Sequence, residues 1–346
     1  MKTLMLISII SLAGFSFWWM RSHKKGKVLS REFIASAIKG NQGGEDPKRR
    51  LTIYLPPGYE QGNERYSVIY YLHGFNANES ELNNMRMNEL LDAAIEEQRI
   101  KPVILVVPGS STTYGGSFYS NSSLTGAWAD YIAKDVVAYV DQNFRTLADK
   151  HHRGLAGHSM GGNGALKISM LFPDVFGSVY ALSPSVLNWG EEFSYNNKGF
   201  RIIQTAKNKT DIFNDLYANI LLDMARTYSP NAQKPPYYAE LPVEFNSDSM
   251  QVRTDIVALW EKQFPMVMME EHLADLKGLS GLKIDWGKDD EFPHIPFTCL
   301  QFSKKLKENG IQHEAEEYIG THGNMLGGAN GRISLQMLPF FDQQFK

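Results

Sequence analysis

The chain has 346 residues, of which 43% are hydrophobic and 21% are charged, an ordinary composition for a globular protein with a sizeable core. Its formal net charge of −3 gives no signature of nucleic-acid binding, and its single cysteine, Cys299, excludes an intramolecular disulfide. No H-E-x-x-H or C-x-x-C motif points to a metal site.

The N-terminal segment from Leu4 to Met20 carries no charge, and a basic cluster follows it. This length is the lower limit for a membrane-spanning helix, and the segment also resembles a signal peptide. The basic cluster favours a cytoplasmic C-terminal side, which conflicts with export. We expect residues 1–27 to be a signal peptide or membrane anchor, so that the protein is secreted, periplasmic or membrane-anchored. A cytoplasmic-facing anchor and a buried core helix are the alternatives.

The polar stretch over residues 28–49 is interpreted as a linker, and the sheet is expected to begin after it. The predicted elements then alternate between strands and helices, which is typical of an α/β fold with a doubly wound, mostly parallel sheet. The strands are expected at Arg50–Leu55, Tyr66–Leu72, Val103–Val107 and Val175–Leu182, with a helix at Asp130–Phe144. The loop from Gly109 to Thr125 either borders a pocket or is simply flexible.

The most informative stretch is a G-x-S-x-G motif at Gly157–Gly161. The residues before it predict a strand, and those after it predict a helix that ends before Pro173. A serine on such a sharp turn exposes its hydroxyl at the edge of the sheet, and the helix points its N-terminal amides at any anion that forms there. This context favours Ser159 as the nucleophile of a serine hydrolase over a chance serine in a glycine-rich turn.

A nucleophilic serine needs a base and an acid, in the chain order serine, acid, histidine. A predicted strand at Leu282–Gly287, a helix at Ile295–Asn309 and a strand at Glu314–Ile319 form one parallel unit. Such a unit brings the loops after both strands to the same edge of the sheet. His322, in the second loop, is therefore the expected base, whereas His294 lies on the acid loop itself and is placed to line the rim.

The acid is less clearly marked than the base. Asp289, Asp290 and Glu291 are adjacent in the loop, and only one of them can orient His322. Asp285 lies within the preceding strand and is expected to be structural. The chain order therefore leaves three candidates.

The anion formed during acyl transfer also needs two amide donors. One is expected from Met160, which follows the nucleophile, and the other from the loop after an earlier strand. The β-rich run Tyr66–Leu72 is followed by His73-Gly74-Phe75, so the amide of Phe75 is the candidate.

These motifs, taken in order, resemble the putative-esterase family, which includes esterase D (S-formylglutathione hydrolase), feruloyl esterases, enterochelin-type esterases and the antigen 85 mycolyltransferases. The resemblance covers Arg50 to Phe345 with a gap in the middle, and it implies an α/β-hydrolase fold. It places the acid three residues after Gly287, at Asp290, and it also puts an oxyanion donor at Phe75. The segments that carry it are Leu55–Tyr59, Tyr71–Gly74, Gly157–Gly162, Gly287–Asp290 and Gly320–Gly323.

The gap, from Ser183 to Gly281, interrupts the alternating pattern. An apolar helical face begins at Ile212, and helices are also predicted at Val252–Trp260 and Met266–Leu276. We interpret residues 188–280 as a mostly helical cap inserted into a catalytic domain of residues 50–346, with a role in specificity and not in chemistry. The alternative is that its aromatic residues simply pack against the core.

Together these residues predict a serine carboxylic-ester hydrolase that acts through an acyl-enzyme on a small or medium acyl ester. Ser159, Asp290 and His322 are the expected triad, and the amides of Phe75 and Met160 are the expected oxyanion hole. No cofactor or metal is expected, and the expected partner is a small-molecule ester; residues 4–20 are the candidate for membrane association. An acyltransferase to a sugar or lipid hydroxyl and a non-catalytic binding protein on a hydrolase scaffold are the alternatives. The oligomeric state is not predicted.

Overall fold

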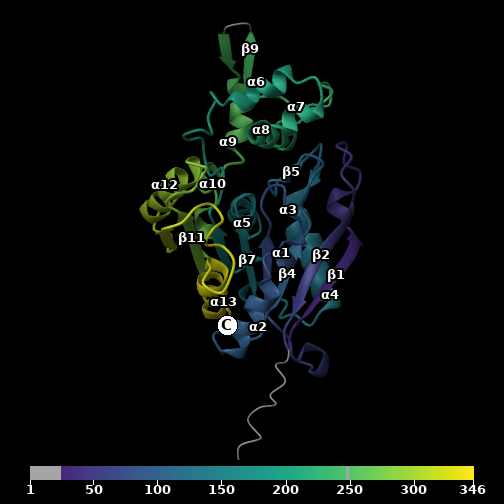
Figure 1. Ribbon diagram of the computed structural model, residues 1–346, viewed down its shortest axis with the longest axis vertical. Helices are drawn as coiled ribbons and strands as arrows, with labels where there is room; N and C mark the ends of the chain where they lie inside the picture. Colours follow the sequence, from purple (N-terminus) through teal and green to yellow (C-terminus); the bar gives the residue numbers. More distant parts are fainter. Residues whose placement is uncertain (1–24, 247–248) are drawn as a thin grey trace, which may run out of the picture.

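The computed structural model describes residues 25–246 and 249–346 and is built on an eight-stranded sheet with the order β1-β2-β4-β3-β7-β8-β11-β12 (Figure 1). Strand β2 is antiparallel to β1 and β4, and the other neighbours are parallel. The predicted α/β fold with a mostly parallel sheet is confirmed. The strands are β1 (Lys27–Ile34), β2 (Lys48–Leu55), β3 (Val68–Leu72), β4 (Ile104–Pro108), β7 (Arg153–His158), β8 (Ser178–Leu182), β11 (Gly281–Gly287) and β12 (Glu314–Tyr318).

The three helices predicted outside the cap are present, and the structure adds helices at Glu81–Asn84, Met87–Glu96 and Leu338–Gln344 that were not predicted. The helix predicted at Asp130–Phe144 exists, but its middle turn is a π-helix at Tyr131–Val136. A second π-helix at Ile333–Met337 leads into the last helix. The α-helices are α1 (Glu81–Asn84), α2 (Met87–Glu96), α3 (Trp128–Asp130), α4 (Val137–Asn143), α5 (Met160–Leu171), α12 (His294–Glu308) and α13 (Leu338–Gln344); short 3-10 turns lie at Ser36–Ile38, Tyr59–Gln61 and Lys150–His152.

The central strands are apolar throughout because both faces of the sheet are covered. In β3, Val68, Tyr70 and Leu72 enter one hydrophobic core, whereas Ile69 and Tyr71 enter the other. Successive side chains of a strand point to opposite faces, so a fully buried strand must be apolar at every position. This explains why the β-rich run shows no alternation of polar and apolar residues.

The interpretation of residues 28–49 as a linker is wrong. Residues Lys27–Ile34 form strand β1, which pairs antiparallel with β2 over its whole length. Ala35 and Ile38, which follow it, are fully buried. The strand is polar because it lies at the edge of the sheet, where several of its side chains face water and where charged residues discourage pairing with other chains. The folded domain therefore begins before Arg50.

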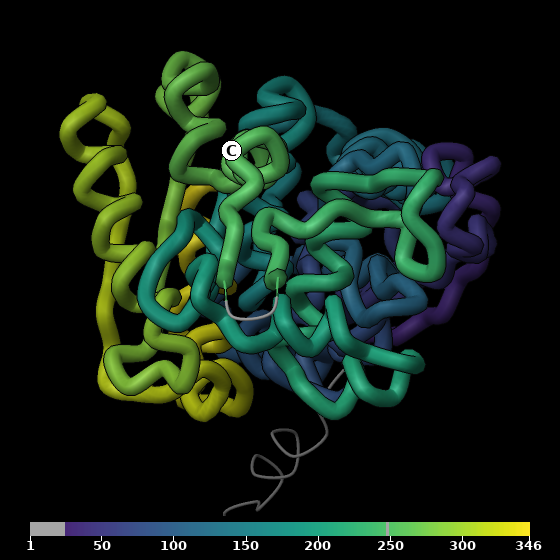
Figure 2. Tube along the Cα trace, turned by 90° about the horizontal axis from the view of Figure 1, so that it is seen from above, coloured from purple at the N-terminus to yellow at the C-terminus, as the bar shows by residue number. Residues whose placement is uncertain are grey.

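The segment between β8 and β11 forms the cap, seen from above in Figure 2 as the teal and green tube over the middle of the molecule. It is mostly helical, as expected, and it also holds a hairpin of β9 and β10. The helix predicted at Met266–Leu276 is two short helices, α10 and α11. The elements are α6 (Lys198–Thr205), α7 (Lys209–Phe213), α8 (Leu216–Tyr228), β9 (Val243–Asn246), β10 (Ser249–Val252), α9 (Thr254–Glu261), α10 (Pro265–Met268) and α11 (Leu273–Lys277).

The expected signal peptide or anchor, with its uncharged segment Leu4–Met20, lies outside the described residues. Between residues 25 and 346, leaving aside 247–248, no helix combines the length and the apolar character needed to cross a membrane.

Candidate active site

The serine of the G-x-S-x-G motif lies on the turn between β7 and α5, as the motif predicts. Ser159 has φ 58° and ψ −117°, a backbone conformation that side chains larger than glycine rarely adopt. The turn is held by hydrogen bonds from the Ser159 amide to the Leu182 carbonyl (3.0 Å) and from the Ser185 amide to the Ser159 carbonyl (3.1 Å). The strained serine is therefore fixed by β8 and by the residues that follow it.

The glycines of this turn are needed because backbones approach closely there. A Cβ atom at Gly161 would overlap the Leu72 carbonyl, and a Cβ atom at Gly157 would overlap the backbone of Gly161. Neither glycine has a positive φ angle. Their role is therefore to let α5 start against the end of β3 and leave Ser159 at the turn.

His322 and Asp290 meet at the same edge of the sheet. The Nδ1 atom of His322 lies 2.8 Å from Oδ2 of Asp290, whose side chain is fully closed off from solvent. The other Asp290 oxygen accepts the Phe292 amide at 2.9 Å. A buried carboxylate on Nδ1 selects the tautomer in which Nε2 can act as a base. The structure thus brings His322 to Asp290, and not to its exposed neighbour Asp289.

The rest of the loop holds the histidine in place. Glu291 accepts the backbone amide of His322 at 2.9 Å, and this hydrogen bond lowers the pKa of Glu291. The His322 ring packs between the rings of His158 and Phe292, with centroids 4.5 and 4.9 Å away. His158 also joins its Nε2 to the His322 carbonyl at 2.8 Å. Burial, followed by the nearby His322, lowers the pKa of His158 to about 3, so this ring is neutral and donates the hydrogen bond.

The residues that carry the two expected oxyanion donors line the same cavity as the serine. Met160 is the first residue of α5, and Phe75 follows the end of β3; in the described parts of the chain, neither amide has a hydrogen-bond acceptor. No hydrogen bond joins Ser159 to His322 in the part of the chain that the structure describes, and such catalytic hydrogen bonds often tighten only when substrate binds.

His73 fixes the start of the loop that carries Phe75. Its ring is buried, and its Nε2 atom accepts the Ser110 amide at 2.9 Å. Burial lowers the pKa of His73 to about 4.

One cavity of about 240 Å³ is lined by Ser159, His322, Phe75 and Met160. Its other walls are largely aromatic and aliphatic. Cap helix α8 supplies part of the wall, so the cap does lie over the serine. The apolar lining residues are Phe118, Val186, Phe193, Leu216, Ile220, Phe292 and Ile295.

The sequence profile of the family described as "Putative esterase" matches residues 46–324, which is most of the chain. The chain belongs to this family. Esterase Rv1288 of Mycobacterium tuberculosis is 25% identical over 312 residues, which are 87% of this chain and 57% of that protein. An endo-1,4-beta-xylanase/feruloyl esterase of Xylanibacter ruminicola is 34% identical over 131 residues, 36% of this chain and 18% of the relative. The chain therefore spans 57% of the length of the first of these relatives and 18% of the second.

Solved structures agree with this assignment at the level of the fold. A ferulic acid esterase aligns with a TM-score of 0.63 and 18% identity, covering 93% of this chain and 99% of that one. The S-formylglutathione hydrolase FrmB of Staphylococcus aureus aligns with a TM-score of 0.57 and 16% identity, with coverages of 93% and 99%. The fold of this esterase-family member is therefore that of the α/β hydrolases.

A hydrogen-bonded group of His294, Glu192 and Tyr217 lies at the wall of the cavity that Ser159 lines. The sequence analysis did not predict this group. His294 contributes Nδ1 to Glu192 Oε1 at 2.6 Å, and the Tyr217 hydroxyl donates to the same oxygen at 2.7 Å. Burial raises the pKa of Glu192, but the hydrogen bonds from His294 and Tyr217 outweigh it, so the pKa is lowered. His294 is therefore hydrogen-bonded to Glu192, and it lines the cavity, as its position on the acid loop indicated. No sequence spacing links these three residues, because they come from separate parts of the fold.

A further carboxyl missed by the sequence analysis is Glu81 of α1, which lines the cavity beside the loop that follows β3. Burial raises its pKa to about 7.

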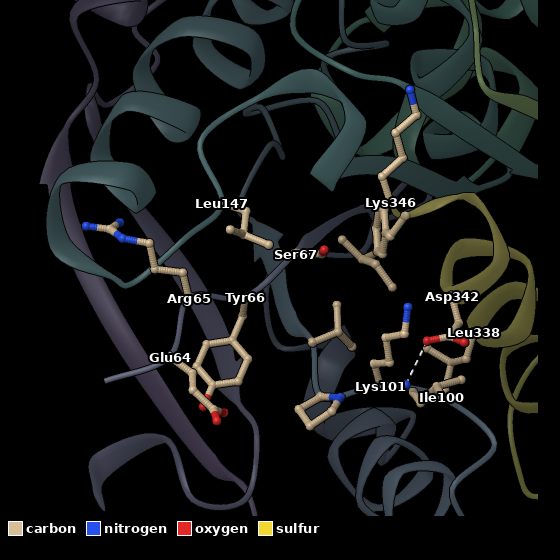
Figure 3. Close-up of a pocket in the computed structure, with 14 residues that line it drawn as sticks. Glu64, Arg65, Tyr66, Ser67, Ile100, Lys101, Leu147, Leu338, Asp342 and Lys346 are labelled. Atoms are coloured by element: carbon tan, nitrogen blue, oxygen red, sulfur yellow. Dashed lines mark hydrogen bonds between the residues drawn. The ribbon is translucent and has the colours of Figure 1, made fainter. Parts of the chain in front are cut away.

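A second cavity, of about 450 Å³, lies at the opposite end of β3 and β4 (Figure 3). Its lining residues Glu64–Ser67 and Ile100–Val103 precede these strands, so it opens at the amino ends, whereas the predicted triad lies at the carboxyl ends. Ligands of open parallel sheets bind beyond the carboxyl ends of the strands. The smaller cavity at Ser159 is therefore the candidate active site. Within the described ranges, no cluster of three or more histidine, cysteine or acidic side chains is placed to hold a metal ion.

Proposed function

We propose that this chain is a serine carboxylic-ester hydrolase that cleaves small or medium acyl esters through an acyl-enzyme on Ser159. The observation that carries the proposal is the pairing of His322 Nδ1 with the buried carboxylate of Asp290, in a cavity that also contains the strained serine. Membership of the esterase family supports the same reaction class.

The steps follow from the placement of these groups. His322 removes the Ser159 proton as the hydroxyl attacks the acyl carbonyl, and Asp290 stabilises the imidazolium that forms. The unpaired amides of Phe75 and Met160 receive the developing oxyanion, and removing one such donor typically costs about 3 kcal/mol of transition-state stabilisation. His322 then returns the proton to the leaving alcohol or thiol, and water repeats the sequence to release the acid.

The size and lining of the cavity support a compact acyl group. Its volume of about 240 Å³ lies below the range of about 300–1,000 Å³ typical of pockets for drug-sized ligands. Aromatic walls from Phe75, Phe118 and Phe193 favour a flat or short apolar group. Because the names of two relatives include ferulate esterases, methyl ferulate belongs in the substrate panel.

The test compares wild type with Ser159→Ala on 4-nitrophenyl acetate, butyrate and octanoate, methyl ferulate and S-formylglutathione. The variant should lose at least about a thousandfold in kcat, since losing the nucleophile of a triad costs that much or more. A fluorophosphonate should label wild type once, at Ser159, and leave the variant unlabelled. A folded wild type that neither hydrolyses nor labels would favour the binding-protein reading, and ester products formed with added alcohols would favour the acyltransferase.

We also propose that residues 1–27 direct the protein to export or anchor it to a membrane. The uncharged run at Leu4–Met20 supports this role. Fractionation of cells that express the full chain, followed by N-terminal sequencing, tests it: a cytosolic protein with an intact N-terminus would contradict both forms of the proposal.

A further inference from the structure

Cap helix α8 carries a fully buried carboxyl group, Asp223, that the proposed reaction does not use. Its Oδ1 atom accepts the Thr112 hydroxyl at 2.9 Å, and its Oδ2 atom accepts the Gly116 amide at 3.0 Å. Burial raises the pKa of Asp223 to about 8 in spite of these hydrogen bonds. Burying a carboxyl group is costly unless it is well hydrogen-bonded, so its two partners, both on the loop after β4, are the reason to look further.

This loop packs directly against the two residues that supply the oxyanion donors. A Cβ atom at Gly116 would overlap the Met160 sulfur and would lie 2.8 Å from the Phe75 ring. A Cβ atom at Gly115 would lie 2.6 Å from the same ring, and the Asn76 amide donates to the Gly115 carbonyl at 3.2 Å. The backbone of these two glycines therefore sets the space that Phe75 and Met160 can occupy.

The ends of the loop are fastened to His73, which begins the oxyanion loop. The Ser110 amide donates to His73 Nε2, and the Tyr119 hydroxyl donates to the His73 carbonyl, both at 2.9 Å. Besides the Asn76 hydrogen bond to Gly115, two acids from elsewhere fasten the middle of the loop. Glu45 accepts the Thr113 amide at 2.9 Å, and Asp223 of the cap holds Thr112 and Gly116. Of these two acids, Asp223 accepts the amide of Gly116, the glycine that packs against both Phe75 and Met160.

We infer that Asp223 is a positioning residue for the oxyanion hole, through which the cap takes part in catalysis; the inference rests on the proposed function. The physical reason is that oxyanion donors act only at the correct distance from the developing charge. Removing one donor costs roughly a hundredfold to a thousandfold in kcat, and a misplacement of 1 Å from a distant change can cost about a hundredfold. A loop released from Asp223 can move away from Phe75 and Met160, and both donors can then shift.

The test uses the full chain and 4-nitrophenyl acetate. Asp223→Ala should lower kcat by about tenfold to a hundredfold, with much less change in KM, and should slow fluorophosphonate labelling of Ser159 by a similar factor. Asp223→Asn should recover most of the activity, since its oxygen can accept the Gly116 amide while its NH₂ donates to Thr112. Thr112→Val removes the hydrogen bond from the Thr112 hydroxyl to Asp223 and should also lower kcat. This variant replaces Asp223→Ala in the test if Asp223→Ala does not fold.

The matched control is Leu222→Ala, on the same helix. Leu222 is 1% exposed, and its loss should lower the thermal midpoint without reaching the loop. The inference is supported if kcat falls in Asp223→Ala and in Thr112→Val but not in Leu222→Ala at equal or greater loss of stability. It is overturned if kcat falls equally in the control, or stays at the wild-type value in Asp223→Ala. Hydrolysis and labelling by wild type test the proposed function separately.

Discussion

At the scale of single residues, two neighbouring carboxylates of one loop have opposite environments. The Asp290 side chain is fully closed off from solvent and lies 2.8 Å from His322, whereas Asp289 is exposed. Asp289 lies in the turn that follows β11, where its side chain faces solvent, and the next residue turns its carboxylate to the histidine. Chain order alone left Asp289, Asp290 and Glu291 open, and the third of these instead holds the His322 backbone.

The pair Asp290→Asn and Asp289→Asn tests this difference. The first change should reduce kcat by about 10⁴, because an amide on Nδ1 favours the wrong histidine tautomer. The second change should alter only a surface charge and leave kcat close to wild type. Steady-state kinetics on one ester suffices, and a larger loss in Asp289→Asn than in Asp290→Asn would move the acid to Asp289.

Lys167 of α5 is a buried charged residue that no sequence motif predicted. Its ammonium group is fully buried and donates to the Phe118 carbonyl and the Tyr228 hydroxyl, both at 3.3 Å. Burial lowers its pKa from 10.5 to about 7. In the unfolded chain the same group holds its proton more tightly, so the folded state is penalised as pH falls from 10.5 towards 7.

Lys167→Met removes this titration and gives a pH-dependent prediction. The free energy of unfolding of wild type, measured relative to the variant, should decrease as pH is lowered from about 10 to about 7 and should level off below that. Urea unfolding at several pH values measures it. A difference between the two proteins that is independent of pH would show that the lysine keeps its ordinary pKa in the folded state.

At the scale of elements, strand β1 shows how a polar stretch becomes part of the sheet. Its residues Lys27–Ile34 pair with β2 along their whole length, and the Gly26 amide donates to Asp92 at 2.8 Å. Cap helix α8 is a second element whose place differs from the expectation. The cap was expected to set specificity only, but its Asp223 is hydrogen-bonded to the loop after β4, which packs against Phe75 and Met160.

Truncation from the N-terminus tests the place of β1. A chain that begins at Lys25 should fold and retain activity, because all of β1 is kept. A chain that begins at Ala35 should be less soluble and less stable, because it leaves the edge of β2 unpaired and exposed to other chains. Thermal unfolding and size-exclusion chromatography compare the two, and equal behaviour would mean that β1 contributes little.

At the scale of the whole molecule, a network of ion pairs around the buried Asp285 ties the C-terminal part of the chain to the sheet. Arg332 donates from Nε to Asp285 of β11 at 2.7 Å and from Nη1 to Glu316 of β12 at 2.8 Å. The Tyr180 hydroxyl of β8 donates to the same Asp285 oxygen. Burial raises the pKa of Asp285 to about 6 although Arg332 opposes it. This agrees with the expectation that Asp285 is structural.

Arg332→Leu should lower the free energy of unfolding by about 3–5 kcal/mol, because it leaves Asp285 buried without a cation. Arg50→Leu is the control, since Arg50 pairs with Glu32 on the surface and exposed pairs contribute little. Urea unfolding compares the two variants with wild type. A loss in Arg332→Leu no larger than in the control would show that water or protonation compensates Asp285.

The sequence by itself determined the order of the α/β elements, the strand-to-helix turn at Ser159 and the loop that carries His322. These depend on local patterns, namely apolar runs, glycines at a turn and the chain order of a triad. The family spacing had selected Asp290, but only the tertiary structure showed that its carboxylate faces His322, that β1 completes the sheet and that Glu192 meets His294. Each of these depends on which segments become neighbours in space, and a polar residue has the same local sequence signal whether it meets water or a partner far along the chain.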